Sequence, residues 1–322
     1  MTVRMLITGT GELSVTERHA VGDDFPTPLA PVLADFDVRA HLGRKGTSFY
    51  DRATALAVVA CQQALRTGAV EVSDDNRARI GVVLGTTVGS FRSTSDFSRE
   101  TLVQEKPYLV NPVLFPNTVM NCAAGQAAIR FGLRGVNATI AGGRLAFHHA
   151  LRHAGMSLRR QAADIVLVGA VEEHSPHRAW AAERSSGGTA VAGEAAGVFV
   201  VERAEGPRRS GGRVLTEVTG LATGFDGLGD GLGDGLASCV ARAVRDQRVT
   251  LHLATGGETV DLPERPVRLD IGDRYGECDA ASGALAMAEA VRRIEADAAE
   301  NVLITAWTPE GGVAAALVRG PR

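Results

Sequence analysis

The 322-residue sequence lacks the features that mark several large classes of protein. Aromatic residues make up only 5%, and 34 Lys and Arg against 37 Asp and Glu leave a formal net charge of −3. Without a basic excess, the sequence does not predict a surface for nucleic acid. The longest apolar stretches, such as residues 55–61, fall far short of the roughly 20 residues that a membrane-spanning helix needs. The sequence therefore predicts no nucleic-acid partner and no membrane segment.

Cysteine is also scarce, and the cysteines that are present are not paired in motifs. Cys61, Cys122, Cys239 and Cys278 lie far apart, and none belongs to a CxxC pair. Such spacing is typical of reduced thiols in a cytoplasmic protein. Residues 1–9 also lack the long apolar core of a signal peptide and pass directly into a strand pattern. We therefore expect a cytoplasmic protein.

Short apolar runs bounded by glycine or charge alternate with longer helical patterns along the chain. This alternation predicts an α/β protein with buried, largely parallel sheets. A Gly- and Pro-containing break at residues 205–212 divides the chain into a longer half, residues 1–205, and a shorter half, residues 206–322. The predicted strands are residues 3–8, 79–84, 137–141, 165–168, 197–202, 214–218, 249–254, 267–271, 302–306 and 313–318. The predicted helices are residues 49–66, 123–133, 145–160, 236–246 and 280–295.

Two motifs that suggest a cofactor are better explained without one. The glycine-rich segment at residues 85–90 follows a strand but lacks both the Gly-Lys-Ser/Thr ending of a phosphate loop and the GxGxxG spacing. His148, His149 and His153 cluster on one predicted helix, but the glutamate of an HExxH zinc motif and a third ligand are missing. Packing in a polar helix or an interface explains these histidines better than a metal. We therefore expect no cofactor and no metal.

Cys122 is a candidate nucleophile because it lies at the predicted start of a helix. The partial positive charge at a helix N-terminus lowers the pKa of a thiol. The sequence places no His and Asp pair near Cys122, and a small buried cysteine is the commoner role. Both interpretations stay open at the level of sequence.

Several blocks of the chain, taken together and in order, resemble a known family. Single blocks are weak, but their number and order make the sequence similar to the β-ketoacyl synthases of the thiolase superfamily. The resemblance implies a thiolase-like fold in which two similar halves form an α-β-α-β-α layered sandwich, here in a compact version. The blocks are residues 6–11, 50–54, 80–89, 125–137, 163–172, 193–202 and 276–286.

Three positions depart from what the resemblance implies for an active ketosynthase. Such an enzyme uses a cysteine at the elbow after one strand, and two histidines that assist decarboxylation and stabilise the enolate oxygen. The cysteine position maps onto Arg144, the second histidine onto Glu277, and the first histidine onto the region of Ala254. A guanidinium has no usable lone pair and cannot accept an acyl group. A carboxylate at residue 277 would repel a developing enolate. We expect no independent catalysis.

The family contains non-catalytic copies, the chain length factors of type II polyketide synthases, which form heterodimers with an active ketosynthase. That enzyme receives its substrates from an acyl carrier protein. The cysteine position is usually glutamine in chain length factors, so Arg144 departs from them as well. The resemblance implies that the segment before Gly125 and Gln126 floors the acyl-chain tunnel, although ordinary interface packing is the alternative for each residue. The implied tunnel residues are Leu114, Phe115, Thr118, Val119 and Met120.

The short second half favours the compact subunits of highly reducing systems that build polyenes. Two other hypotheses remain at this level. One is a repurposed thiolase-fold acyltransferase or hydrolase that uses Cys122 or one of His148, His149 and His153. The other is a self-associating pseudoenzyme with a structural role.

Overall fold

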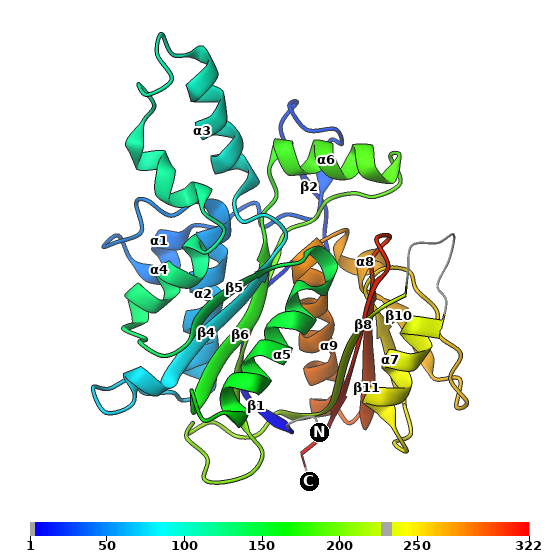
Figure 1. The fold of residues 1–322 in the computed structure, drawn as a ribbon. Helices are drawn as coiled ribbons and strands as arrows, with labels where there is room; N and C mark the ends of the chain where they lie inside the picture. The colour runs from blue at the N-terminus through cyan, green and yellow to red at the C-terminus, as the bar shows by residue number, and fades with distance from the viewer. Residues whose placement is uncertain (1–3, 227–233, 322) are drawn as a thin grey trace.

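Two sets of five strands, one from each half of the sequence, build the fold (Figure 1). The computed structural model describes residues 4–226 and 234–321. The first set is β1 (Met5–Leu13), β4 (Ile80–Thr86), β5 (Asn137–Ala141), β6 (Ile165–Glu172) and β7 (Ala195–Arg203). The second set is β8 (Thr216–Phe225), β9 (Leu251–Ala254), β10 (Val267–Asp270), β11 (Asn301–Trp307) and β12 (Gly312–Arg319). A separate two-stranded ribbon is formed by β2 (His19–Ala20) and β3 (Leu29–Ala30).

The two sets repeat the same strand order, so the two similar halves expected from the sequence are present. The sheet runs β10-β9-β11-β12-β8-β1-β7-β6-β4-β5, with the third strand of each set at an outer edge and the first strand at the centre. The halves meet where β1 pairs antiparallel with β8 over Met5–Ile7. The expectation of a largely parallel sheet is wrong. In each half the last strand of the set runs antiparallel to both of its neighbours.

The helices form where apolar residues recur at helical spacing, and most begin at a capping residue. For example, Asp51 accepts a hydrogen bond from the backbone N–H of Thr54 at the start of α2, as capping residues do. The longer helices are α2 (Arg52–Thr67), α3 (Phe91–Val103), α4 (Cys122–Phe131), α5 (Ala146–Arg159), α6 (Pro176–Ser186), α7 (Asp234–Val244) and α9 (Ser282–Glu295). The short ones are α1 (Val38–Leu42), α8 (Ile271–Tyr275), η1 (Arg77–Arg79), η2 (Pro112–Thr118), η3 (Gly143–Leu145) and η4 (Asp279–Ala281).

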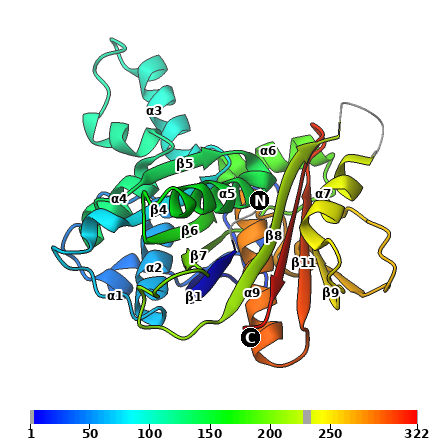
Figure 2. The ribbon, with the colours of Figure 1, turned by 60° about the horizontal axis from the view of Figure 1, so that its bottom comes forward.

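Five layers are visible when the molecule is turned (Figure 2). Helices α2 and α4 cover the outer face of the first strand set, and their apolar residues pack with those of β4, β6 and β7. Helices α5 and α9 fill the middle layer between the two strand sets. Helix α7 covers the outer face of the second set. This is the predicted α-β-α-β-α sandwich.

Two of the longer helices were missed by the sequence prediction. Helix α3 carries no buried residue and projects beside η2 as an arm (Figure 1), so it lacks the apolar face that reveals a helix. Helix α6 starts with Ser175 as its cap and Pro176 in its first turn, a helix-start pattern that the prediction overlooked.

Within the described ranges, no helix combines the length and the apolar character needed to cross a membrane. The same residues contain no group of three or more His, Cys, Asp or Glu side chains arranged to hold a metal ion.

Candidate functional site

The site begins at the turn that joins β5 to α5. After Ala141 the backbone passes through Gly142 and Gly143, and Gly143 adopts a φ of +50° that favours glycine. Arg144 follows within the single 3₁₀ turn that precedes α5. The turn therefore presents the Arg144 side chain at the N-terminal end of a helix whose other residues are largely buried.

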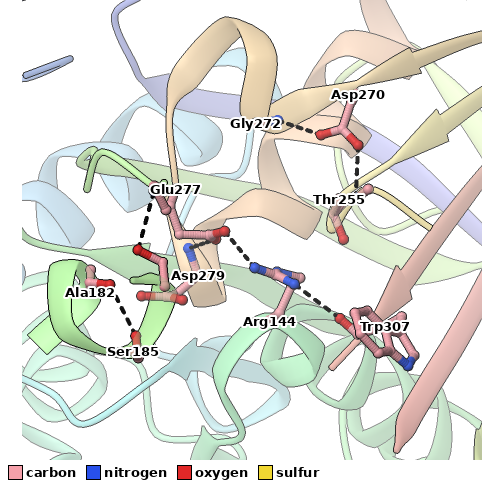
Figure 3. Close-up of polar contacts among 12 residues, drawn as sticks. Arg144, Ala182, Ser185, Thr255, Asp270, Gly272, Glu277, Asp279 and Trp307 are labelled. Carbon is pink, nitrogen blue, oxygen red and sulfur yellow. Dashed lines mark hydrogen bonds and ion pairs between the residues drawn. The ribbon is translucent and has the colours of Figure 1, made fainter. Parts of the chain in front are cut away.

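The Arg144 guanidinium is fixed by contacts to three distant segments (Figure 3). One terminal nitrogen forms an ion pair with the Glu277 carboxylate, and the other donates to the backbone oxygen of Trp307 at 3.2 Å. The guanidinium also lies against Gly256, where an added Cβ would come within 2.5 Å of a terminal nitrogen of Arg144. These contacts hold a cation at the turn between β5 and α5, next to Gly256.

Glu277 is held by its backbone as well as by its side chain. Its N–H donates to the Val191 oxygen at 2.9 Å, and its own carbonyl accepts from Gly193 at 2.9 Å and from Arg178 at 2.8 Å. Burial raises the pKa of Glu277 above its ordinary value, and the attraction of Arg144 only partly offsets that effect. The Glu277 carboxylate accepts a hydrogen bond from the Arg144 guanidinium.

Ala254 is the last residue of β9 and is fully buried. It does not line the cavity described next, and its methyl group offers no donor or base. Of the three positions that depart from the family pattern, the structure brings Arg144 and Glu277 into contact. Ala254 is buried in the core and is not part of this contact.

A cavity of about 810 Å³ opens in front of the Arg144–Glu277 pair. Its walls come from the β4 and β5 ends, α6 and the turn between β11 and β12. The lining residues that matter most for chemistry are Thr87, Arg144, Glu172, Arg178, Glu277 and Asp279. The volume is within the range of ligand pockets, about 300–1,000 Å³, so the cavity is large enough to hold a small ligand.

Arg178 is a site residue that the sequence analysis missed. It is buried on α6, where its guanidinium donates to Asp279 at 2.7 Å and to the backbone oxygen of Gly193 at 2.6 Å. Its Nε also lies 3.7 Å from the carboxylate of Glu172, and burial raises the pKa of that carboxyl. Because these partners are far apart in sequence, only the fold reveals them. Arg178 holds the Glu277 segment in place beneath the cavity.

The five predicted tunnel residues divide into two groups. Thr118, Val119 and Met120 line an open hollow of about 610 Å³ beside the exposed edge of β5. Leu114 and Phe115 do not line this hollow, and the Phe115 ring packs against Phe97 of α3 at 5.9 Å between centroids. Val119 and Met120 are 41% and 49% exposed, so a partner at the β5 edge would contact them directly.

The candidate nucleophile Cys122 begins α4, but its surroundings disfavour a thiolate. Burial raises the pKa of the Cys122 thiol, and its S–H donates to the Asn117 side chain at 3.4 Å. Nearby Asp51 is an acid whose pKa burial raises to about 6. No histidine lines the small hollow that contains Cys122 and Asp51. The geometry therefore gives Cys122 no histidine base in this hollow.

The histidine cluster on α5 does not form a site either. His148 is fully buried, and burial lowers its pKa to about 3, so this imidazole is neutral at physiological pH. Neither of its ring nitrogens has a hydrogen-bond partner among the described residues. His149 and His153 are half-buried on the same helix. None of the three lines the cavity in front of Arg144.

Residues 15–193, more than half of the chain, match the family model described as the N-terminal domain of β-ketoacyl synthases. The chain belongs to the β-ketoacyl synthase family. The resemblance predicted from the sequence blocks is therefore confirmed.

Curated relatives and solved structures agree with this assignment. The 3-oxoacyl-[acyl-carrier-protein] synthase 2 of Vibrio cholerae is 27% identical over 235 residues, which cover 66% of this chain and 56% of that protein. The corresponding synthase of Staphylococcus aureus strain N315 is 25% identical over 223 residues, covering 63% and 54%. The alignments thus span little more than half the length of these curated relatives.

Among solved structures, the ishigamide ketosynthase/chain length factor superposes with a TM-score of 0.85 at 27% identity, covering 99% of both chains. A β-ketoacyl synthase from Burkholderia phymatum gives a TM-score of 0.82 at 19% identity, covering 99% and 100%. A type II polyketide synthase acyl carrier protein in complex with its ketosynthase gives 0.81 at 15%, covering 99% and 100%. The last two show the fold alone, and all three confirm the predicted thiolase-like architecture.

Proposed function

We propose that this chain is a non-catalytic, chain-length-factor-like subunit that pairs with an active ketosynthase in type II polyketide biosynthesis. One observation carries the proposal. The elbow position that bears the family's nucleophile holds Arg144, whose guanidinium is tied to Glu277 and to the Trp307 backbone. A group that is always protonated and has no usable lone pair cannot attack a thioester.

The helpers of that reaction are missing together with the nucleophile. Glu277 presents a carboxylate where stabilisation of an enolate needs a donor or a positive charge. Ala254 supplies neither. Groups that act as a unit contribute non-additively, so restoring one of them alone does not restore the chemistry. The cavity is thus a remnant of the family's acyl site.

The surface beside β5 supports pairing with another subunit. β5 is the last strand of the sheet and carries no charged residue. Next to it, large apolar side chains are exposed on the α3–η2–α4 connection, namely Leu102, Val103, Tyr108, Leu109, Val113, Phe115, Val119, Met120 and Ile129. Exposed apolar surface of this kind marks a contact site. In the proposed heterodimer, Thr118, Val119 and Met120 contact the partner's acyl tunnel.

The likeness to the ishigamide ketosynthase/chain length factor supports this role. The compact second half supports membership of the highly reducing systems that build polyenes. The acyl carrier protein reaches the complex through the active ketosynthase, which holds the growing chain.

An independent acyltransferase or hydrolase is the competing function, and the geometry does not favour it. No histidine lies in the hollow that contains Cys122, and His148 is fully buried in the core. A structural self-associating protein is the other alternative, and it differs from our proposal only in the identity of the partner.

Reconstitution separates these functions. We expect the chain to copurify with the ketosynthase encoded beside it, and condensation on an acyl carrier protein to require both. Intact-mass analysis of the chain alone with an acyl thioester should show no adduct, and Arg144→Cys should remain inactive because the helpers are still absent. A thioester-linked adduct on the isolated wild-type chain would falsify the proposal. A stable homodimer that does not bind the ketosynthase would favour the structural alternative.

A further inference from the structure

A second concave site lies away from the Arg144 cavity and shares no lining residue with it. It is a groove of about 480 Å³ where the C-terminal part of α5 meets β8 and α7. Four arginines line it. Arg152 and Arg159 come from α5, Arg242 comes from α7, and Arg245 follows directly after α7.

Helical spacing and one close contact place these four side chains together. Arg152 and Arg159 are seven residues apart, so they share a face of α5 two turns apart, with Met156 between them. On the other wall, Gly220 of β8 lets α7 lie directly on the strand. A Cβ at Gly220 would come within 1.9 Å of the Ala243 backbone oxygen. The fold thus builds two arginine-bearing walls that face one groove.

The charge of the groove is not neutralised by the protein. Elsewhere in the chain, arginines such as Arg178 and Arg319 are paired with carboxylates. None of the four groove arginines forms an ion pair within the described ranges, and the groove lining includes no Asp or Glu. Arg242 is held at the rim because it donates to the Thr223 backbone oxygen at 3.2 Å. A concave site lined by charge of one sign attracts and concentrates the opposite charge.

The shape and chemistry of the groove indicate the class of anion. Its volume falls in the range of small-ligand sites, about 300–1,000 Å³. Guanidinium groups bind phosphate oxygens in a bidentate manner, and the two walls offer a pair of guanidiniums each. Met5 and Leu221 add an apolar floor. We propose that this groove binds a small ligand with at least two phosphate groups, whose uncharged part rests on Met5 and Leu221.

Titration calorimetry tests this proposal on the full chain, together with its ketosynthase if the two copurify. The probes are pyrophosphate, tripolyphosphate and ATP at about 0.1 M salt, where charges are screened beyond about 10 Å. We expect one binding site per chain. The double variant Arg152→Gln/Arg242→Gln should weaken binding by at least about tenfold, because each guanidinium bond to an anion is worth about 1.5–3 kcal/mol.

A matched control removes two charges outside the groove. Arg66 and Arg134 are exposed and do not line it, so Arg66→Gln/Arg134→Gln should bind as the wild type does. Equal affinity for tripolyphosphate and ATP would overturn the part of the proposal that places the uncharged group on Met5 and Leu221. Tighter binding of ATP would support the additional use of the apolar floor. Absence of binding by all three probes, or an equal loss in the two double variants, would overturn the proposal. An acidic protein that binds the groove while all three probes fail would overturn it too.

Discussion

The two edge strands of the sheet, β5 and β10, occupy the same place in the two halves but differ in sequence. β10 carries Arg268 and Asp270, which form an ion pair at 3.1 Å. β5 reads Asn-Ala-Thr-Ile-Ala and has no charge. Charged side chains protect an edge strand from pairing with another chain, whereas an uncharged edge is open to it. The comparison therefore supports the proposal that the β5 edge, and not the β10 edge, contacts a partner.

The chain segments that lead into the two edge strands, β5 and β10, also differ in structure. Residues 87–136, between β4 and β5, contain α3, η2 and α4, together with most of the exposed apolar side chains. Residues 255–266, between β9 and β10, form no helix in the structure. The helices that accompany the β5 edge therefore have no counterpart between β9 and β10.

Breaking the β5 edge should have the largest effect. Val136 accepts from Val82, and Gly142 donates to Thr86. Because bonding alternates along a strand, Thr139 is in the opposite phase and directs its N–H away from β4. Thr139→Pro removes that N–H without disturbing the β4–β5 bonds. We expect loss of copurification with the ketosynthase, measured by pull-down and size-exclusion chromatography.

Thr139→Val is the matched control, because it keeps the backbone N–H and a β-branched shape. It should retain association. Thermal unfolding of both variants verifies that each is folded. If the folded proline variant still bound the ketosynthase with unchanged affinity, the β5 edge would not be the contact surface.

The sequence predicted the halves and most of their elements because buried strands and amphipathic helices carry local signals. Residues 137–141 were predicted as a strand with the observed bounds. Largely parallel strands were expected from the sequence, and the antiparallel direction of β7 and β12 was missed, because their apolar runs look alike whether their neighbours run parallel or antiparallel. Helix α3 was missed because its stability comes from contacts with η2 and not from an apolar face of its own.

Replacing the Arg144 side chain tests whether its contacts join the first strand set to the second. Arg144 follows β5, whereas Gly256 and Glu277 follow β9 and β10, so this side chain links the two edges of the comparison. Arg144→Ala should lower the free energy of unfolding by about 2 kcal/mol, as expected for lost hydrogen bonds to charged groups that are partly solvated. Urea unfolding measures this loss.

A double-mutant cycle with Glu277→Ala measures how much of this loss comes from the interaction between Arg144 and Glu277. The double variant should lose clearly less stability than the sum of the single losses, with a coupling of about 1 kcal/mol. Strict additivity would mean that the two side chains contribute independently and that the pair does not join the halves.

The Arg144–Glu277 contact illustrates how far sequence reasoning reaches at the site. The family pattern located both positions, because each lies within a recognisable block. That they form an ion pair depends on the packing of two loops more than 130 residues apart. Arg178 had no such signal, since its acceptors are backbone oxygens and carboxylates that only the fold assembles.

The pH dependence of stability probes the hollow behind β5, which contains Asp51 and Thr139. Burial raises the pKa of Asp51 to about 6 from 3.8. The folded chain therefore holds this proton more tightly than the unfolded chain. The resulting stabilisation is present below about pH 4 and is lost as pH rises through about 6. Asp51→Asn keeps the cap and should be more stable than wild type by about 2 kcal/mol at pH 8.

Urea unfolding of both proteins between pH 5 and pH 8 measures this difference, which should shrink toward the acidic end. Asp37→Asn, at the exposed cap of α1, is the matched control and should show no such trend. A pH-independent gain in Asp51→Asn would show that the carboxyl of Asp51 is not the titrating group.

The smallest expected effect separates the roles of two predicted tunnel residues, Met120 and Phe115. Met120 lines the hollow at β5, whereas Phe115 packs on Phe97 away from it. In the reconstituted pair, Met120→Ala should lengthen the mean product, because it removes volume where the partner's tunnel is proposed to end. Phe115→Ala should leave product length unchanged. Mass spectrometry of released products compares the two, and a longer product from Phe115→Ala alone would move the tunnel floor from the β5 hollow to the α3 arm.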